Sequence, residues 1–211
     1  MEALIIALNG NEAKVGQKLQ KMVEKKEYDS LPKILNKIKV PKGCTLGLQC
    51  LNYDECCGMG DESHLKITLP DGKVLLDTDN GFWKFISCEA SSAGAWQMYL
   101  LYNLWHYLPL FWHANYERRW YIYTDEQLKK CVKLNDEDHG EPLEGFDPDK
   151  YDISPLIWEE DGTYHVSACY WTNFGGLIRE EFKIAVGEKA HVYSRPVSHR
   201  TLYRYECGIC Y

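Results

Sequence analysis

The sequence lacks the short motifs that mark the commonest nucleotide-binding and hydrolase sites. It contains no Gly-x-Gly-x-x-Gly segment, no phosphate-binding loop and no Gly-x-Ser-x-Gly segment. Such motifs hold phosphates with backbone N–H groups or present a nucleophilic serine. Internal repeats and low-complexity segments are also absent. Composition, the distribution of charge and individual reactive side chains are therefore the features that bear on function.

Charge is missing from the middle of the chain, because residues 90–116 contain no Asp, Glu, Lys or Arg. The spacing predicts a helix over Gly94–Leu108 that is apolar on every face, and such a helix is either buried or lies in a membrane. Polar residues interrupt it, and unpaired polar groups in lipid cost several kcal/mol each. We therefore expect a buried core helix and no membrane span, with Ser91 or Ser92 as the N-cap and an end before Pro109.

Length and net charge limit the organisation of the chain. We expect one domain over residues 1–211, with a possible internal boundary in an acidic loop at 134–155. The net charge of −7 makes nucleic acid an unlikely partner. The apolar run Ala3–Leu8 is too short for a signal peptide. The nine cysteines are therefore expected to be reduced thiols of a cytoplasmic protein.

Hydrophobic periodicity predicts an α+β fold. N-terminal helices and one buried aromatic helix are expected to pack on antiparallel sheet, and the chain is expected to end in a β-meander of four or five strands. Apart from the aromatic helix, the expected helices cover about 11–26, 30–38 and 126–132, and the expected strands lie near 4–8, 46–51, 65–69, 74–76, 82–86, 118–123, 156–158, 163–171, 177–186, 191–194 and 201–205.

One candidate site depends on a cysteine. Cys88 is expected within one turn of the N-terminus of the buried helix, where the helix dipole would stabilise a thiolate. His165 on a later strand could act as the base, and Asn173 could orient its imidazole. This order of residues resembles the layout of papain-like cysteine hydrolases, which implies a hydrolytic activity. The alternative is that Cys88 is a core thiol, because free cysteine is among the most buried residue types.

A metal site is the second hypothesis. Cys207 and Cys210 have the spacing of one zinc-binding pair. A zinc site of this kind needs two pairs, and the spacings of the other cysteines match no standard zinc-binding motif. We therefore expect no metal ion and no cofactor.

Aromatic and basic side chains indicate a binding surface on the C-terminal strands. Strand residues alternate between two faces, so some of these side chains must point outward. Exposed Trp, Tyr and Arg side chains are typical of protein-binding hot spots. The alternative is an ordinary aromatic core. The candidate binding residues are Trp158, Tyr164, Tyr170, Trp171, Arg179, Arg195 and Arg200.

Charge is also distributed unevenly along the chain. Residues 14–42 carry nine lysines and three acidic residues. This pattern indicates either the solvated faces of two helices or a surface for an acidic partner or a phosphate backbone. We expect a non-enzymatic protein-binding module, such as an inhibitor, an immunity-type protein or a regulatory protein, whose partner is another protein. A cysteine-dependent hydrolase is the alternative function.

Overall fold

The helices and antiparallel sheets confirm the predicted α+β class with its C-terminal strand meander. The structure is a computed structural model, and it describes residues 5–8, 10–51, 62–104, 119–139, 143, 145–188, 190–193 and 196–205. The α-helices are α1 (Gly10–Glu24), α2 (Leu31–Ile34), α3 (Ser92–Tyr102) and α4 (Asp125–His139), and short 3-10 helices cover Tyr28–Ser30, Phe82–Phe85 and Pro148–Lys150.

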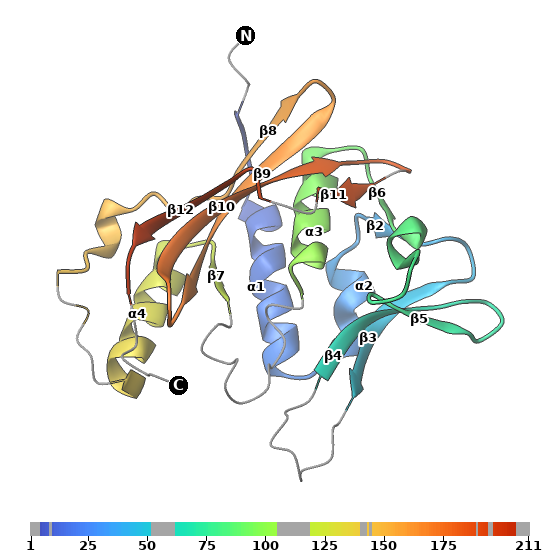
Figure 1. The fold of residues 1–211 in the computed structure, drawn as a ribbon, viewed down its shortest axis with the longest axis horizontal. Coiled ribbons are helices and arrows are strands. Elements are labelled where there is room, and N and C mark those ends of the chain that lie inside the picture. The colour runs from blue at the N-terminus through green and yellow to red at the C-terminus, as the bar shows by residue number, and fades with distance from the viewer. Residues whose placement is uncertain are drawn as a thin grey trace.

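Strands β9 and β10 form the centre of a seven-stranded antiparallel sheet, the main sheet. One edge of β9 pairs with β8 and, farther along, with β7, while β10 pairs with β11 and β12. Figure 1 shows these strands crossing over α1 and α3, with α4 near one end. The strands are β1 (Ile5–Ala7), β7 (Trp120–Ile122), β8 (Leu156–Glu160), β9 (Thr163–Thr172), β10 (Gly176–Ala185), β11 (His191–Val192) and β12 (Ser198–Tyr203).

Two smaller antiparallel sheets lie at the other end of the molecule from α4 (Figure 1). In one of them, β2 (Ile38–Lys39) pairs with β6 (Ser87–Cys88). In the other, β4 (Glu62–Thr68) lies between β3 (Thr45–Leu51) and β5 (Val74–Leu76). The hairpin of β4 and β5 agrees with the alternation of apolar and polar residues in the sequence.

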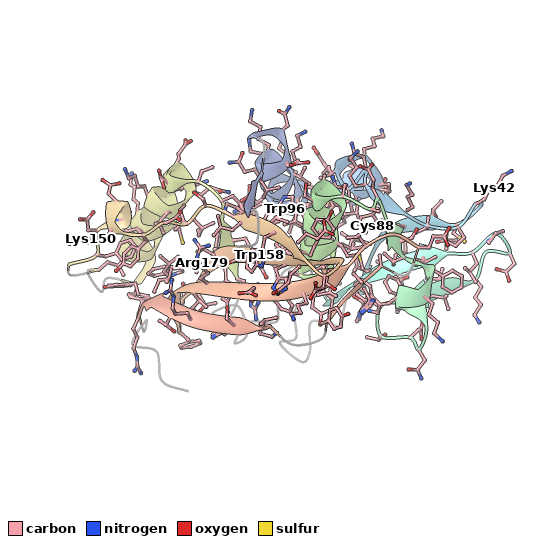
Figure 2. The ribbon with its side chains drawn as sticks, turned by 90° about the horizontal axis from the view of Figure 1, so that it is seen from above. Lys42, Cys88, Trp96, Lys150, Trp158 and Arg179 are labelled. Carbon is pink, nitrogen blue, oxygen red and sulfur yellow. The ribbon has the colours of Figure 1, made fainter. Side chains whose placement is uncertain are left out.

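The inner face of the main sheet, which packs on α3, carries the larger core. Directly opposite residues of antiparallel strands point to the same face, so the pairing register assigns the side chains of β9 and β10 to faces. Val166, Ala168 and Tyr170 of β9 and Ile178, Phe182 and Ile184 of β10 all belong to this core. Figure 2 views the molecule from above and shows both α1 and α3 on one side of the strands.

The outer face of the main sheet is also buried, but only near α4. Cys169 and Trp171 of β9 pack there with Leu177 of β10 and with Leu128 and Cys131 of α4. These residues alternate along their strands with the residues of the inner core. Both faces of β9 and β10 are therefore buried at this end of the sheet.

Helix α3 is the buried aromatic helix that the sequence predicts. The Ser91 Oγ atom accepts a hydrogen bond from the Gly94 N–H at 3.1 Å, which makes Ser91 the N-cap. The helix ends at Tyr102 instead of at the predicted Leu108. The Tyr99 carbonyl accepts hydrogen bonds from both the backbone N–H and the side-chain amide of Asn103, each at 3.1 Å. Of the helices described, none is long and apolar enough to cross a bilayer.

Three other predictions of local structure are wrong. The strand predicted over 82–86 is the 3-10 helix Phe82–Phe85, which follows Gly81 at a φ of 97°, a backbone conformation that glycine adopts readily. The second N-terminal helix shortens to α2, and Ile38 lies in β2. Helix α4 continues well beyond the predicted 126–132, into the segment that the acidic composition suggested was a loop.

Gly94 allows α3 to begin close to the preceding backbone. A Cβ atom added at Gly94 would lie 1.9 Å from the Glu89 carbonyl oxygen. Alanine normally stabilises a helix by up to about 1 kcal/mol relative to glycine, but this backbone clash outweighs that gain. We expect Gly94→Ala to lower the free energy of unfolding by about 2 kcal/mol or more, measured by urea denaturation.

Gly47→Ala is the control, because its added Cβ would meet only the Lys66 side chain at 3.5 Å. This variant should change the free energy of unfolding by less than about 1 kcal/mol. Equal losses in the two variants would contradict the assigned role of Gly94.

Candidate functional site

The buried cluster near α4 on the outer face of the main sheet is the second core. Farther along the strands, the outer face carries charged, polar and aromatic side chains. We call this part of the face the outer strip. Its residues come from four strands that the pairing register places side by side. Most are half-buried, whereas Arg200 is exposed and His165 is buried. The outer strip consists of Trp158, His165, Arg179, Glu181, Lys183 and Arg200.

His165 is held by groups of the outer face. Its Nδ1 atom lies 2.8 Å from a Glu181 carboxylate oxygen, and its Nε2 atom lies 3.3 Å from Glu160. The Trp158 ring stacks on the imidazole, with 4.8 Å between the ring centroids. Both ring nitrogens therefore have carboxylate partners, and the ring has one fixed orientation.

The structure does not bring Cys88 and His165 together. Cys88 is buried in the core of the inner face, whereas His165 lies on the outer face. The Cys88 N–H donates to the Gly187 carbonyl at 3.2 Å. Burial raises the pKa of the Cys88 thiol, although Lys39 and the Gly187 backbone partly oppose this shift. The environment of Cys88 is therefore that of a core thiol.

Asn173 is also remote from His165. It follows directly after β9, and His165 lies near the opposite end of that strand. A strand rises roughly 3.3 Å per residue, so the two residues are separated by about 25 Å. Asn173 cannot orient the His165 imidazole at that separation.

The candidate binding residues are divided among three environments. Trp158, Arg179 and Arg200 lie on the outer strip. Tyr164 is half-buried and packs against the inner core. Tyr170 and Trp171 are buried in the inner and second cores respectively, so their side chains are not available to a partner. Arg195 lies outside the described residues.

Arg179 and Arg200 lie directly opposite each other across β10 and β12. The Arg179 guanidinium donates to the Ser154 carbonyl and the Ser167 hydroxyl, each at 3.3 Å, and to the Asp152 carbonyl. Within the part of the chain that the structure describes, neither arginine forms an ion pair with a carboxylate. Like charges directly opposite each other on a sheet are destabilising, and no ion pair among the described residues offsets the repulsion between these two arginines.

A cavity of about 270 Å³ lies beside these two arginines. Its walls combine basic side chains with one carboxylate and with apolar groups. They are formed by Lys150, Tyr151, Asp152, Leu156, Arg179, Arg200 and Leu202. We call this cavity the basic pocket.

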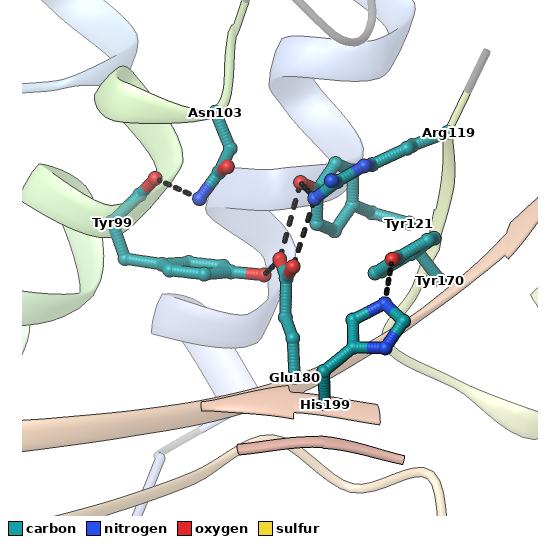
Figure 3. A network of polar contacts seen from close by, with 7 residues as sticks. All are labelled: Tyr99, Asn103, Arg119, Tyr121, Tyr170, Glu180 and His199. Carbon is teal, nitrogen blue, oxygen red and sulfur yellow. Dashed lines mark hydrogen bonds and ion pairs between the residues drawn. The ribbon is translucent and has the colours of Figure 1, made fainter. Parts of the chain in front are cut away.

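A buried carboxylate forms a separate network on the inner face. Glu180 is 1% exposed, and it accepts hydrogen bonds from the Tyr99 hydroxyl at 2.8 Å and the Tyr121 hydroxyl at 3.3 Å. Arg119 lies 2.8 Å from its other oxygen. Figure 3 shows these groups converging on Glu180 from α3, from β7 and from the residue that precedes β7.

The network continues from Arg119 toward the surface. Its guanidinium carbon lies 4.4 Å from the centroid of the Tyr170 ring, a cation–π contact. The Tyr170 hydroxyl and His199 Nε2 are 2.8 Å apart. His199 is exposed, so the chain of contacts leads from the buried carboxylate to an edge strand (Figure 3).

Burial dominates the electrostatics of this network. It raises the pKa of Glu180 even though Arg119, Tyr99, Tyr121 and His199 all favour the carboxylate. Burial and the nearby Glu180 also raise the pKa values of Tyr99 and Tyr121 well above their usual value. Both tyrosine hydroxyls therefore remain protonated donors to Glu180.

The sequence interpretation missed the Glu180 network, although one signal was present. Along β10, the inner-face positions read Ile178, Glu180, Phe182 and Ile184. One carboxylate among alternating apolar residues is unusual, because a buried charge needs a partner. Its partner Arg119 could not be identified in this way, since it is far away in the sequence.

The predicted absence of a metal site concerns residues inside and outside the described ranges. Over the described ranges, no group of three or more His, Cys, Asp or Glu side chains is arranged to hold a metal ion. Cys207 and Cys210 lie outside those ranges.

Comparisons with known proteins identify no relative: no protein-family model, no curated protein and no solved structure matches the chain. The arrangement of its own side chains makes the outer strip with the basic pocket the candidate site.

Glu180 should give a pH dependence of stability with a defined sign. Its pKa is raised in the folded state, so the unfolded chain loses this proton more readily as the pH rises. The contribution of Glu180 to stability is therefore greatest below the pKa of the unfolded carboxyl, about 4.3, and is lost as the pH rises through the folded pKa.

We expect the free energy of unfolding of the wild type, relative to Glu180→Gln, to fall between pH 4 and pH 7. Each unit by which the folded pKa exceeds the unfolded one corresponds to about 1.4 kcal/mol. Urea denaturation of both proteins at several pH values measures this difference. A difference that stays constant or increases with pH would contradict the raised pKa.

The buried thiols should react slowly with alkylating agents. Burial raises the pKa of Cys88, that of Cys131 to about 12 and that of Cys169 to about 11, and the thiolate is the reactive form. We expect iodoacetamide at pH 7.5 to label these three at least about tenfold more slowly than the half-buried Cys44. Peptide mapping by mass spectrometry measures the rates. Faster labelling of Cys88 than of Cys44 would instead support the hydrolase hypothesis.

Proposed function

We propose that the protein is a binding module that recognises another protein through the outer strip and the basic pocket. The observation that carries this proposal is the pair of opposed arginines, which have no carboxylate partner among the described residues and lie beside a cavity with apolar walls. A protein surface with uncompensated positive charge favours an acidic partner through electrostatic complementarity.

Two properties of the outer strip support a binding role. Trp158 is half-buried and lies on the same face as Arg179, and Trp and Arg are enriched in binding hot spots. The imidazole beneath Trp158 is fixed by two carboxylates. Such a preorganised surface loses little conformational entropy when a partner binds.

The hydrolase alternative has less support. Cys88, His165 and Asn173 lie far apart. The pKa of Cys88 is raised, which disfavours the thiolate. A catalytic cysteine needs a lowered pKa or an adjacent base. The proposal therefore assigns recognition, and not turnover, to this chain.

Quantitative affinity capture from cells that express the protein tests this function. We expect a set of proteins to be captured by the wild type and to fall about tenfold or more with Arg200→Glu, since such losses are typical of a charged hot-spot residue. Trp158→Ala should deplete the same set. A purified member of the set should then bind the wild type directly, with the same order of affinities.

Lys73→Glu is the matched control, because it makes the same change of charge at an exposed position between β4 and β5, far from the outer strip in the fold. This variant should capture the set as the wild type does. A set of captured proteins that is insensitive to both Arg200→Glu and Trp158→Ala would refute the proposal.

A further inference from the structure

The basic pocket has the charge of a site for a dianion. Three basic side chains, Lys150, Arg179 and Arg200, line it together with one carboxylate, Asp152. Lys150 pairs with the Asp147 carboxylate at 3.5 Å, so the two arginines supply the excess of positive charge. A second cavity, of about 210 Å³ between α1, β7 and α4, lacks this imbalance, because its two lysines are matched by two glutamates. The excess of positive charge is thus a property of the basic pocket and not of every hollow on the surface.

Arg179 is positioned as an anion-binding group. A guanidinium has five N–H donors in a fixed plane. Two carbonyl oxygens and the Ser167 hydroxyl accept from Arg179 and fix its orientation without neutralising it. N–H donors of Arg179 therefore remain for a ligand. Because this long side chain is already ordered, it loses little conformational entropy when a ligand binds.

Arg200 supplies the second fixed charge. It lies opposite Arg179 across the β10–β12 pair and is exposed. Neither a hydrogen bond nor an ion pair involves its guanidinium among the described residues. An anion between the two arginines would relieve their repulsion and would accept charge-assisted hydrogen bonds from both, a geometry that favours phosphate or carboxylate oxygens.

The apolar walls add a requirement on the ligand. Tyr151, Leu156 and Leu202 are half-buried and line the same cavity. An inorganic anion would leave these walls in contact with water, whereas an anion on an apolar or aromatic stem would cover them. Because a phosphate monoester carries about −1.5 to −2 charges at pH 7, it matches the charge excess better than a carboxylate does.

We infer that the basic pocket binds the phosphoryl group of a phosphorylated side chain on the partner protein, with Arg179 and Arg200 as its ligands and Tyr151, Leu156 and Leu202 against its stem. The assignment of the source to a protein rests on the proposed function. The phosphoryl chemistry rests on the pocket alone, so the two parts can be tested separately.

Isothermal titration of the full chain with phenyl phosphate tests the phosphoryl chemistry. We expect saturable binding that Arg200→Gln weakens about tenfold or more, because a charge-assisted hydrogen bond is lost. Benzoate, which has the same ring and one negative charge, should bind about tenfold more weakly than phenyl phosphate. Binding should also weaken as salt increases, since the pocket is open to solvent.

Two further variants separate a ligand role from a structural one. Lys73→Gln removes a cation from the exposed turn between β4 and β5, outside both the outer strip and the pocket lining, and it should leave phenyl phosphate binding unchanged. Asp152→Asn removes the one carboxylate of the lining, and it should strengthen binding, a gain that damage to the fold would not produce. Absence of saturable binding, equal binding by Arg200→Gln, or equal binding of benzoate would overturn the inference.

An acetylated tripeptide amide with a central phosphotyrosine tests the source. It should bind at least as tightly as phenyl phosphate, and weaker binding would overturn the assignment to a protein side chain. Failure of both probes while Arg200→Glu still depletes captured partners would overturn the phosphoryl inference and leave the proposed function intact. Binding of both probes without any partner that depends on Arg200 would refute the proposed function.

Discussion

The pairing of β9 with β10 is the constraint on which the rest of the structure depends. Nine residue pairs join the two strands, from Gly176 opposite Thr172 to Ile184 opposite Tyr164. At the α4 end both faces are buried, so the register decides which side chains enter which core. A slip of one residue would exchange the faces. It would move Arg179 into the inner core and Glu180 onto the outer face.

Burial of Glu180 connects the main sheet to α3 and β7. A carboxylate in an apolar core is costly unless hydrogen bonds and an opposite charge compensate it. Tyr99, Tyr121 and Arg119 provide these contacts from separate elements. Each contact is available only when those elements are docked in one arrangement. The network therefore favours a specific packing of helix against sheet, in addition to any stability that it contributes.

The outer face combines rigidity with unsatisfied charge. His165 is fixed between Glu160 and Glu181, and backbone carbonyls fix Arg179. In contrast, neither of the two opposed arginines forms an ion pair with a carboxylate of the residues that the structure describes. A surface that is held in place and yet electrostatically incomplete is suited to recognition, because binding supplies the missing charge without requiring a rearrangement.

The sequence by itself determined the features that depend on neighbouring residues. The α+β class, a buried helix capped at Ser91 or Ser92, and strands at the positions of β8 and β9 all follow from periodicity and capping within short segments. Only the tertiary structure decided which faces those elements share. It placed Cys88 and His165 on opposite sides of the sheet, and it buried Tyr170 and Trp171.

The physical reason is that contacts between distant segments depend on strand register and on helix docking. Glu180 meets Tyr99 across 81 positions of sequence, and Arg179 meets the Asp152 carbonyl across 27. Local sequence patterns do not identify such pairs, because each residue alone is compatible with several partners. Composition therefore singled out Trp158, Arg179 and Arg200 as candidate binding residues, while their position on one face of the main sheet emerged only when the strands were assembled.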